Sequence, residues 1–321
     1  MSVQTKVRFV QPLPANIGRL QALINPYALS LRASGKADKT LRTYRDAVTK
    51  FAGWLLDSGA SAEEVVKVVR DDWADVEKTD IEHYMIWLME RYSDGYANNQ
   101  YRALQQFFKW HSDEEELPNP MAKLSPPKPG ERVVPVLEVD QLGMLIKDCD
   151  GKSFDARRDV AIIRFFASTG ARLAEVANLD INDVDLTTRT ARVIGKGDRE
   201  RIVKFDHKCA QAIDRYLRVR ARHKLADSPK LWLGVRNREP MTPDGVYQMI
   251  ARRGGRLGIP VHPHMFRHTF SHRWLDAGGA EGDLMEINGW TSPQMIRHYG
   301  RSARGARARR AYDRVDVMGG V

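Results

Sequence analysis

Residues 190–205 read TARVIGKGDRERIVKF and alternate β-branched with polar residues around a central Gly-Lys-Gly-Asp. Such alternation on both sides of a glycine-containing turn predicts a β-hairpin over 190–205. The stretches on either side of it, such as 139–147 and 157–169, instead repeat apolar residues at helical spacing. We therefore expect a mainly α protein of the α+β class, with a small β-hairpin or sheet inside a mostly helical domain.

A proline-rich segment divides the chain of 321 residues into two parts. Six of the 15 prolines fall within 118–135, where fixed φ angles and missing N–H groups prevent a long helix or a central strand. Before this segment, helical spacing of apolar residues through 41–55, 81–88 and 98–110 predicts an all-α domain of four or five helices. The expected organisation is an N-terminal extension at 1–16, a helical domain at 17–117, a linker at 118–135 and a second domain with a C-terminal tail at 136–321.

The composition excludes several classes of protein. No apolar run is long enough to span a membrane, because the longest, around 160–167, is broken by Arg164. The N-terminus lacks the continuous apolar core of a secretory signal, and two cysteines, Cys149 and Cys209, cannot build a disulfide framework. We therefore expect a cytoplasmic protein with no membrane partner.

The net charge of +10 lies entirely in the second part of the chain. Residues 1–130 hold 17 basic and 17 acidic side chains, whereas residues 131–321 hold 34 and 24. Within the first part, residues 1–50 are mostly basic and residues 51–100 mostly acidic. Such polarity suggests a basic surface that faces a polyanion, and nucleic acid is favoured over a membrane because no long basic amphipathic helix is evident. On charge alone, a merely solvated basic surface explains the same numbers.

Residues 168–179, STGARLAEVANL, form the first candidate site. Gly170 is expected to end one helix, with Arg172 in the first turn of the next helix and Glu175 three residues later on the same face. An arginine near a helix N-terminus suits a phosphate, because its guanidinium donors add to the free backbone N–H groups. Taken by itself, the motif also fits a surface ion pair.

Residues 262–272, HPHMFRHTFSH, form the second candidate site. His264 and Arg267 are three apart on a helix that opens after Pro263, so together they can contact one phosphate. His264, His268 and His272 also follow the spacing i, i+4, i+8, which could bind zinc. Since no Glu stands in a HExxH arrangement and no cysteine is near, we expect no metal at these histidines.

Residues 288–300, NGWTSPQMIRHYG, form the third candidate site, with Trp290 nine residues before Tyr299. Tyrosine is a poor nucleophile at neutral pH because its pKa is about 10. Near arginines its phenolate is stabilised, and it can then attack phosphorus. Taken alone, a tyrosine at this position is more often a structural aromatic residue than a nucleophile.

Together, these motifs resemble the tyrosine recombinase (phage integrase) family in both order and spacing. The matching positions are Arg172 with Glu175, Lys196 between two glycines, His264 with Arg267, and Trp290 followed by Tyr299. The resemblance extends from about residue 17 to Tyr312, because residues 40–55, TLRTYRDAVTKFAGWL, resemble the family's helical, SAM-like core-binding domain. The sequence departs from the usual family pattern at Trp290 (most often His), Phe266 (usually Leu) and Ala171. Trp290 can donate only one hydrogen bond and cannot shuttle a proton.

The resemblance implies a site-specific DNA recombinase that needs no cofactor. Tyr299 would attack a DNA phosphodiester and form a 3′-phosphotyrosyl link. Arg172, Arg267 and Trp290 would stabilise charge on the phosphate. Lys196 would protonate the leaving 5′-oxygen, His264 would assist Tyr299, and Glu175 would hold Arg172 or His264 in place.

The resemblance also implies how the protein meets its partners. The two domains would form a C-shaped clamp around duplex DNA, and a homo-tetramer would assemble on two recombination sites. DNA contacts are expected from Lys39, Thr40, Arg42 and Arg45 in the first domain and from Arg199 and Arg201 on the hairpin. The tail, with six arginines from Arg301 to Arg314, would dock on a neighbouring protomer. The resemblance would also place the protein on the nucleoid and give it a role in a mobile element.

Two other functions share parts of this pattern. A type IB topoisomerase-like relaxase would use the same phosphotyrosine chemistry on one duplex as a monomer. A catalytically silent DNA-binding regulator would keep the fold alone. Tyr312 is a rival nucleophile only in name, because it lies 22 residues after Trp290 and lacks the preceding motif. The target site, the biological setting and any accessory protein are not determined by these residues.

Overall fold

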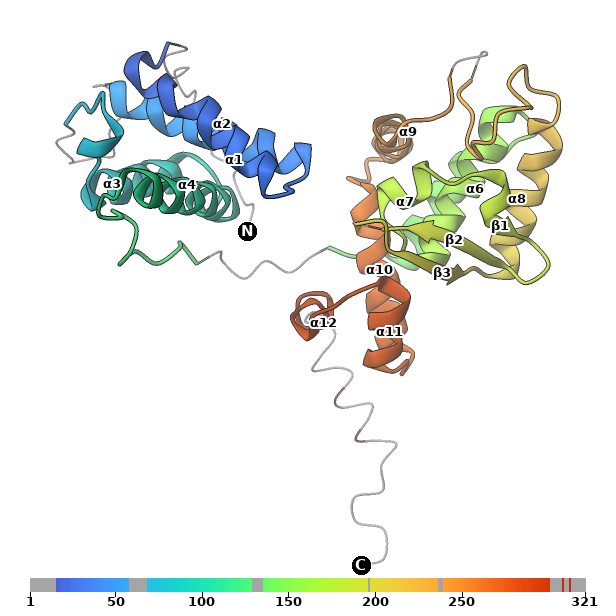
Figure 1. Ribbon diagram of the computed structural model, residues 1–321. Coiled ribbons are helices and arrows are strands. Elements are labelled where there is room, and N and C mark those ends of the chain that lie inside the picture. The colour runs from blue at the N-terminus through green and yellow to red at the C-terminus, as the bar shows by residue number, and fades with distance from the viewer. Residues whose placement is uncertain are drawn as a thin grey trace, which may run out of the picture. The chain divides into compact units, whose positions relative to one another are not determined.

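The computed structural model describes residues 16–57, 68–128, 135–195, 197–235 and 239–300, together with Ala308 and Tyr312. In the last helix the side chains are described as far as Ile296. The chain separates into two compact units, 1–132 and 133–321 (Figure 1). In the parts of the chain described, no helix is long and apolar enough to cross a bilayer.

The first unit is helical. Its described elements are α1 (Ile24–Ala33), α2 (Asp38–Leu56), α3 (Lys78–Arg91) and α4 (Asp94–Glu115), with short 3-10 helices at Gly18–Leu23 and Trp73–Asp75. The helices expected around 41–55, 81–88 and 98–110 are therefore α2, α3 and α4. Residues at helical spacing on α2, including Val48, Phe51 and Leu55, are fully buried. They pack around aromatic rings from the other helices, such as Tyr84 and Phe108.

The first half of the proline-rich segment is anchored to the first unit. Met121 is buried in its core. Two side chains of α4 bind the segment's backbone: Asn98 Nδ2 donates to the carbonyl of Pro127 (2.7 Å), and the Tyr101 hydroxyl donates to the carbonyl of Leu124 (2.6 Å). Residues 121–127 thus follow the surface of α4.

The second unit is mostly helical and contains a small sheet. Its helices are α5 (Val139–Asp148), α6 (Phe154–Thr169), α7 (Leu173–Ala177), α8 (His207–Arg220), α9 (Pro243–Arg256), α10 (Pro263–Asp276), α11 (Glu281–Asn288) and α12 (Pro293–Gly300), with a 3-10 turn at Ile181–Asp183. The strands β1 (Val184–Asp185), β2 (Thr190–Ile194) and β3 (Glu200–Lys204) form an antiparallel sheet in that order. The hairpin expected over 190–205 is β2 and β3, and the mainly helical class is confirmed.

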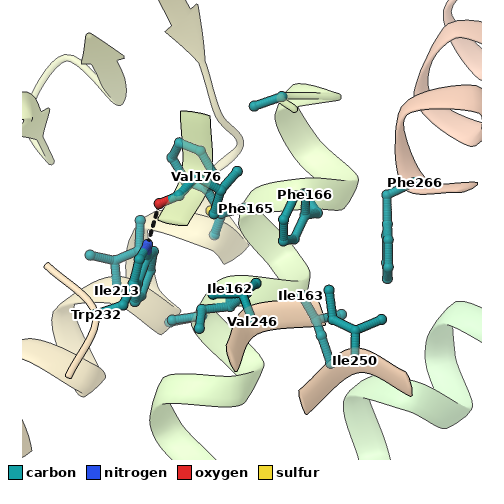
Figure 2. Close-up of a cluster of buried hydrophobic side chains, with 14 of the residues drawn as sticks. Ile162, Ile163, Phe165, Phe166, Val176, Ile213, Trp232, Val246, Ile250 and Phe266 are labelled. Atoms are coloured by element: carbon teal, nitrogen blue, oxygen red, sulfur yellow. Dashed lines mark hydrogen bonds between the residues drawn. The ribbon is translucent and has the colours of Figure 1, made fainter. Parts of the chain in front are cut away.

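Helix α6 forms the centre of the second unit's core. Its side chains, among them Ile163 and Phe166, pack against residues of α8, α9 and α10 (Figure 2). The indole N–H of Trp232 donates to the backbone carbonyl of Val176 at 2.8 Å, which ties α7 to this core (Figure 2). The end of α6 and the start of α7 are therefore held by packing on several sides.

Candidate active site

The turn that positions Arg172 depends on Gly170. Gly170 ends α6 in the left-handed conformation, with φ of 62°, and its N–H donates to the carbonyl of Phe166. A Cβ atom at this position would lie 2.7 Å from the ring of Phe270, so both the backbone and the packing require glycine. Arg172 has extended backbone angles and caps α7. This corrects the expectation that it lies in the first helical turn, because the first helical residue is Leu173.

Arg172 and Glu175 are joined by two hydrogen bonds. The backbone N–H of Arg172 donates to Glu175 Oε2 at 2.7 Å, and Arg172 Nη1 donates to Oε1 at 2.8 Å. The Glu175 side chain is 1% exposed, whereas the Arg172 side chain is 38% exposed. Within the described residues, Nε and Nη2 of Arg172 make no hydrogen bond. An anion at this surface can therefore receive two donors from a guanidinium that is already fixed in place.

Arg201 on β3 holds the other side of the same carboxylate. Its Nη1 lies 2.6 Å from Glu175 Oε1 and its Nη2 lies 2.8 Å from Oε2. Its Nε donates to the carbonyl of Ile287 at 2.9 Å. All three guanidinium nitrogens thus donate within the protein, and the side chain is 12% exposed. These internal partners argue against the expected DNA contact of Arg201.

Strand alternation could have revealed the inward position of Arg201. Successive side chains of a strand point to opposite faces, so Arg201 shares a face with Val203. Val203 is buried at 1% exposure, and the residues that alternate with it, Glu200, Ile202 and Lys204, are exposed. The sequence shows this pattern, but it does not show which carboxylate Arg201 meets.

The environment of Glu175 keeps its carboxylate charged. Burial by itself raises the pKa of this group. The hydrogen bonds from Arg201 and from Arg172 outweigh it and lower the pKa to about 2. Glu175 is therefore an anion throughout the physiological pH range and holds both arginines by charge as well as by geometry.

The tip of the hairpin carries the predicted general acid. The N–H of Gly195 donates to the carbonyl of Arg199 at 2.8 Å, and Gly197 and Asp198 both have positive φ angles. Arg199 is exposed, as a DNA contact requires. Lys196 lies outside the described residues, so its role stays a prediction.

Arg267 on α10 is buried, in contrast to Arg172. Its exposure is 1%, its Nη1 donates to the carbonyl of Gly170 (3.0 Å), and its Nη2 donates to the carbonyl of Asn288 (2.7 Å). Its guanidinium carbon lies 5.2 Å from the centre of the Trp290 ring, which is cation–π distance. Arg267 thus braces the turn before Arg172 and the end of α11. Its contact with a phosphate stays a prediction.

The histidines of α10 lie on one side of the helix. His264 is exposed on the first turn, and its ring stands perpendicular to that of the buried His268 at 4.7 Å between ring centres. Among the residues that the structure describes, no group of three His, Cys, Asp or Glu side chains is arranged to hold a metal ion. This arrangement leaves His264 exposed one turn before Arg267.

Trp290 lies in a small core that supports α12. It follows Gly289, which ends α11, and it is 6% exposed. It packs with Leu284 of α11 and Ile296 of α12 in a cluster that joins α10, α11 and α12. Since Ile296 precedes Tyr299 by three residues, this cluster fixes the helix that carries the predicted nucleophile. The Tyr299 side chain itself lies outside the described part.

The C-terminal tail is described at two positions only. Tyr312 is helical and 64% exposed. The arginines from Arg301 to Arg314 lie outside the described residues, so the docking of the tail stays a prediction.

The predicted DNA contacts of the first unit gather on the first half of α2. Lys39, Arg42 and Arg45 are exposed, and Thr40 is partly buried. Arg42 and Arg45 line a hollow of about 450 Å³ between α1 and α2, together with Arg32 of α1. Arg32 was not among the predicted contacts. The only hint in the sequence was the basic excess of residues 1–50, which does not single it out.

Both units of this chain match families of known proteins. Residues 135–305 match the phage integrase family, and residues 23–116 match the N-terminal SAM-like domain of phage integrases. The chain is 35% identical over 190 residues to the tyrosine recombinase XerC of Azotobacter vinelandii (strain DJ), covering 58% of this chain and 62% of the relative. It is 31% identical over 190 residues to XerC of Actinobacillus pleuropneumoniae serotype 7, covering 58% and 61%. The match thus spans about three fifths of these relatives.

A solved structure shows the same fold. The integrase of transposon Tn1549, in complex with transposon right end DNA, aligns with a TM-score of 0.71 at 19% identity, over 91% of this chain and 99% of that one. The family model covers more than half of the chain, including the segments with Arg172, Arg267, Trp290 and Tyr299. The resemblance seen in the motifs is therefore confirmed, and the chain belongs to the phage integrase family of tyrosine recombinases.

Proposed function

We propose that this chain is a site-specific DNA recombinase that cleaves and rejoins strands through a covalent bond to Tyr299. The observation that carries the proposal is the half-exposed Arg172, anchored by a buried and charged Glu175 with two guanidinium nitrogens left to donate. Its family membership, and the names of its relatives, support the same activity.

The reaction exchanges one phosphoester for another. The Tyr299 oxygen forms a bond to phosphorus as the bond from phosphorus to the 5′-oxygen breaks, which leaves a 3′-phosphotyrosine. The Tyr299 proton passes to His264, and Lys196 gives a proton to the 5′-oxygen. In the second step a 5′-hydroxyl of the partner strand attacks the phosphotyrosine, and these proton transfers are reversed. Because one phosphoester replaces another and neither is hydrolysed, the reaction needs no nucleotide as an energy source.

The task left to the protein is to stabilise charge on the non-bridging oxygens. Arg172 supplies Nε and Nη2 for this purpose, and Glu175 keeps the guanidinium from turning away. Arg267 and Trp290 complete the donor set once DNA is bound. Because these donors are fixed before the reaction, little reorganisation accompanies the developing charge.

DNA binding would use both units. In the first unit Lys39, Arg42, Arg45 and the newly found Arg32 offer cations to the phosphate backbone, which set position more than sequence. In the second unit Arg199 adds a contact near the hairpin tip. We further propose a tetramer on two recombination sites, assembled through the C-terminal tail, acting on the nucleoid in the cytoplasm.

A type IB topoisomerase-like activity is not favoured, because the relatives are named as recombinases. A silent DNA-binding regulator is not favoured either, because the predicted catalytic positions all hold chemically competent residues.

The test is to capture the covalent intermediate. The full-length protein is incubated, with and without EDTA, with sheared DNA from the region that flanks its gene, and protein-linked fragments are recovered after denaturation and sequenced. We expect adducts at a discrete site and, with two copies of that site, recombinant products. Relaxation of supercoiled plasmid without site preference would indicate the topoisomerase. Adducts that vanish on chelation and return with zinc would restore the metal interpretation of the α10 histidines.

A further inference from the structure

We infer that Arg201 is a positioning residue that holds Arg172, the Lys196 hairpin and the Trp290 segment in one arrangement. The inference rests on the proposed function, since it concerns the same reaction. It assigns to Arg201 a role within the protein in place of a DNA contact.

The first link joins Arg201 to Arg172 through Glu175. Glu175 Oε1 accepts from Arg172 Nη1 and Arg201 Nη1, and Oε2 accepts from the Arg172 backbone and Arg201 Nη2. An ionised carboxylate has about four acceptor sites, so four donors fill this one. Glu175 cannot rotate without breaking several of these bonds. Arg201 therefore sets the orientation of the exposed Arg172 guanidinium indirectly, through Glu175.

The second link joins Arg201 to the segment that carries Trp290. Its Nε donates to the carbonyl of Ile287 in the last turn of α11. The next residue, Asn288, accepts from Arg267 through its own carbonyl. Gly289 packs on the Arg201 stem, because a Cβ atom there would lie 3.4 Å from Arg201 Cδ. The backbone leading into Trp290 is thus held by two arginines, one from β3 and one from α10.

The third link is the strand itself. Arg201 lies opposite Val193 in the ladder of β2 and β3, and it follows Lys196 by five residues. The hairpin is therefore tied to the Glu175 carboxylate close to its turn, by the same side chain that ties α11. One guanidinium connects three segments that each carry a predicted catalytic residue.

Lysine cannot replace this arginine. A guanidinium presents its donors in a rigid plane that matches a carboxylate, whereas an ammonium is a point charge on a flexible stem. Arg201→Lys keeps the positive charge beside Glu175 but cannot form the two-pronged contact and also reach the Ile287 carbonyl. Arg201→Met removes both charge and geometry. Comparing the two variants separates the contribution of the positive charge from that of the planar donor geometry.

The experiment measures single-turnover cleavage of a nicked duplex that carries the captured site, at saturating DNA, with DNA affinity and thermal unfolding measured in parallel. Arg201→Met and Arg201→Lys are compared with Arg192→Met, a control on the neighbouring strand whose exposed guanidinium pairs with Asp183 and Glu200. We expect cleavage to fall about 10²-fold in Arg201→Met and at least about tenfold in Arg201→Lys, the scale of a misplaced catalytic group. DNA affinity should change less than about threefold in all three variants, and Arg192→Met should cleave at the wild-type rate.

A double-mutant cycle distinguishes positioning from general destabilisation. If Arg201 acts mainly through Arg172, Arg201→Met should cost only a few-fold further in an Arg172→Ala background, because coupled residues are not additive. A full additional 10²-fold loss would contradict the inference. So would cleavage at the wild-type rate in the folded Arg201→Lys variant, or weaker DNA binding with normal cleavage at saturation. Absence of adducts from the wild-type protein would instead overturn the proposed function, and the inference with it.

Discussion

Two buried carboxylates in the second unit are each held by a pair of arginines, yet their surroundings differ. Asp159 on α6 accepts from Arg158 through Oδ1 and from Arg253 of α9 through Oδ2. Arg158 and Arg253 are themselves buried. They also bind the carbonyl oxygens of Leu233 and Asp148. Every strong donor of this cluster is used inside the protein.

The cluster around Glu175 is built from the same parts but is open on one side. Arg201 is used entirely within the protein, whereas Arg172 is 38% exposed. Around Asp159, Arg253 joins α9 to α5 and α6, and Arg158 ties α6 to the backbone of Leu233. Around Glu175 one arginine serves the scaffold and the other is presented at the surface. Exposure of a single guanidinium, rather than the ion pair, therefore distinguishes the candidate site from the scaffold.

Among the residues that assist Tyr299, the largest effect on cleavage is expected at Lys196, whose predicted task is proton transfer rather than placement. Lys196→Ala should slow cleavage by about 10²–10⁴-fold, the usual contribution of a positioned acid. A substrate with sulfur in place of the bridging 5′-oxygen should recover most of this loss, because a thiolate leaves without a proton. Normal cleavage by the alanine variant, or a defect that sulfur does not relieve, would move the proton donor elsewhere, with His264 the next candidate.

The next effect is expected at Arg172. Arg172→Ala removes the exposed donors while Arg201 still neutralises Glu175, so cleavage should fall about 10²–10³-fold with little loss of stability. Single-turnover rates on oxygen and sulfur substrates test this, and the variant should stay impaired on both. Full recovery with sulfur would show that Arg172 serves the leaving group instead of the non-bridging oxygens.

At Asp159 we expect the reverse of the Arg172 prediction: a large loss of stability with little change in cleavage. Asp159→Asn leaves the buried Arg158 without its anion and leaves Arg253 paired with Asp148 alone, so it should lower the free energy of unfolding by about 3–5 kcal/mol. Cleavage per folded molecule should stay within about twofold of wild type, because no exposed donor is touched. Chemical denaturation and single-turnover cleavage at low temperature measure the two quantities. A large loss of cleavage at unchanged stability would erase the distinction between the two clusters.

The smallest effect concerns acid stability. The pKa of Glu175 is lowered from 4.5 to about 2 in the folded protein, so its charge stabilises the fold above pH 4.5 and this contribution is lost as the pH falls towards 2. The shift corresponds to about 3 kcal/mol, of which about 2 kcal/mol is lost by pH 3. The difference in unfolding free energy between wild type and Glu175→Gln should shrink by that amount between pH 6 and pH 3. A constant difference would mean that Glu175 is not held as the structure shows.

The sequence predicted local features better than distant contacts. The helices, the hairpin at 190–205 and the helix end at Gly170 follow from spacing and backbone preference, and all are present. The bond between Arg172 and Glu175 could also be anticipated, because the two residues are three apart.

Contacts between distant segments could not be predicted in this way. Arg201 meets a carboxylate 26 residues away and a carbonyl 86 residues away. A basic residue beside a glycine turn fits a DNA contact until its partners are known. The burial of Arg267 and the packing of Met121 on the first unit depend on tertiary structure in the same way.

The central claim is that Tyr299 becomes covalently joined to DNA, and mapping that bond tests it most directly. A nicked duplex with the captured site is incubated with wild type, Tyr299→Phe and Tyr312→Phe, and the adduct is digested and sequenced by mass spectrometry. We expect wild type and Tyr312→Phe to carry a nucleotide on Tyr299. Tyr299→Phe should bind the site and form no adduct, because it keeps the ring but lacks the attacking oxygen. An adduct formed by Tyr299→Phe, or one lost in Tyr312→Phe, would contradict the account.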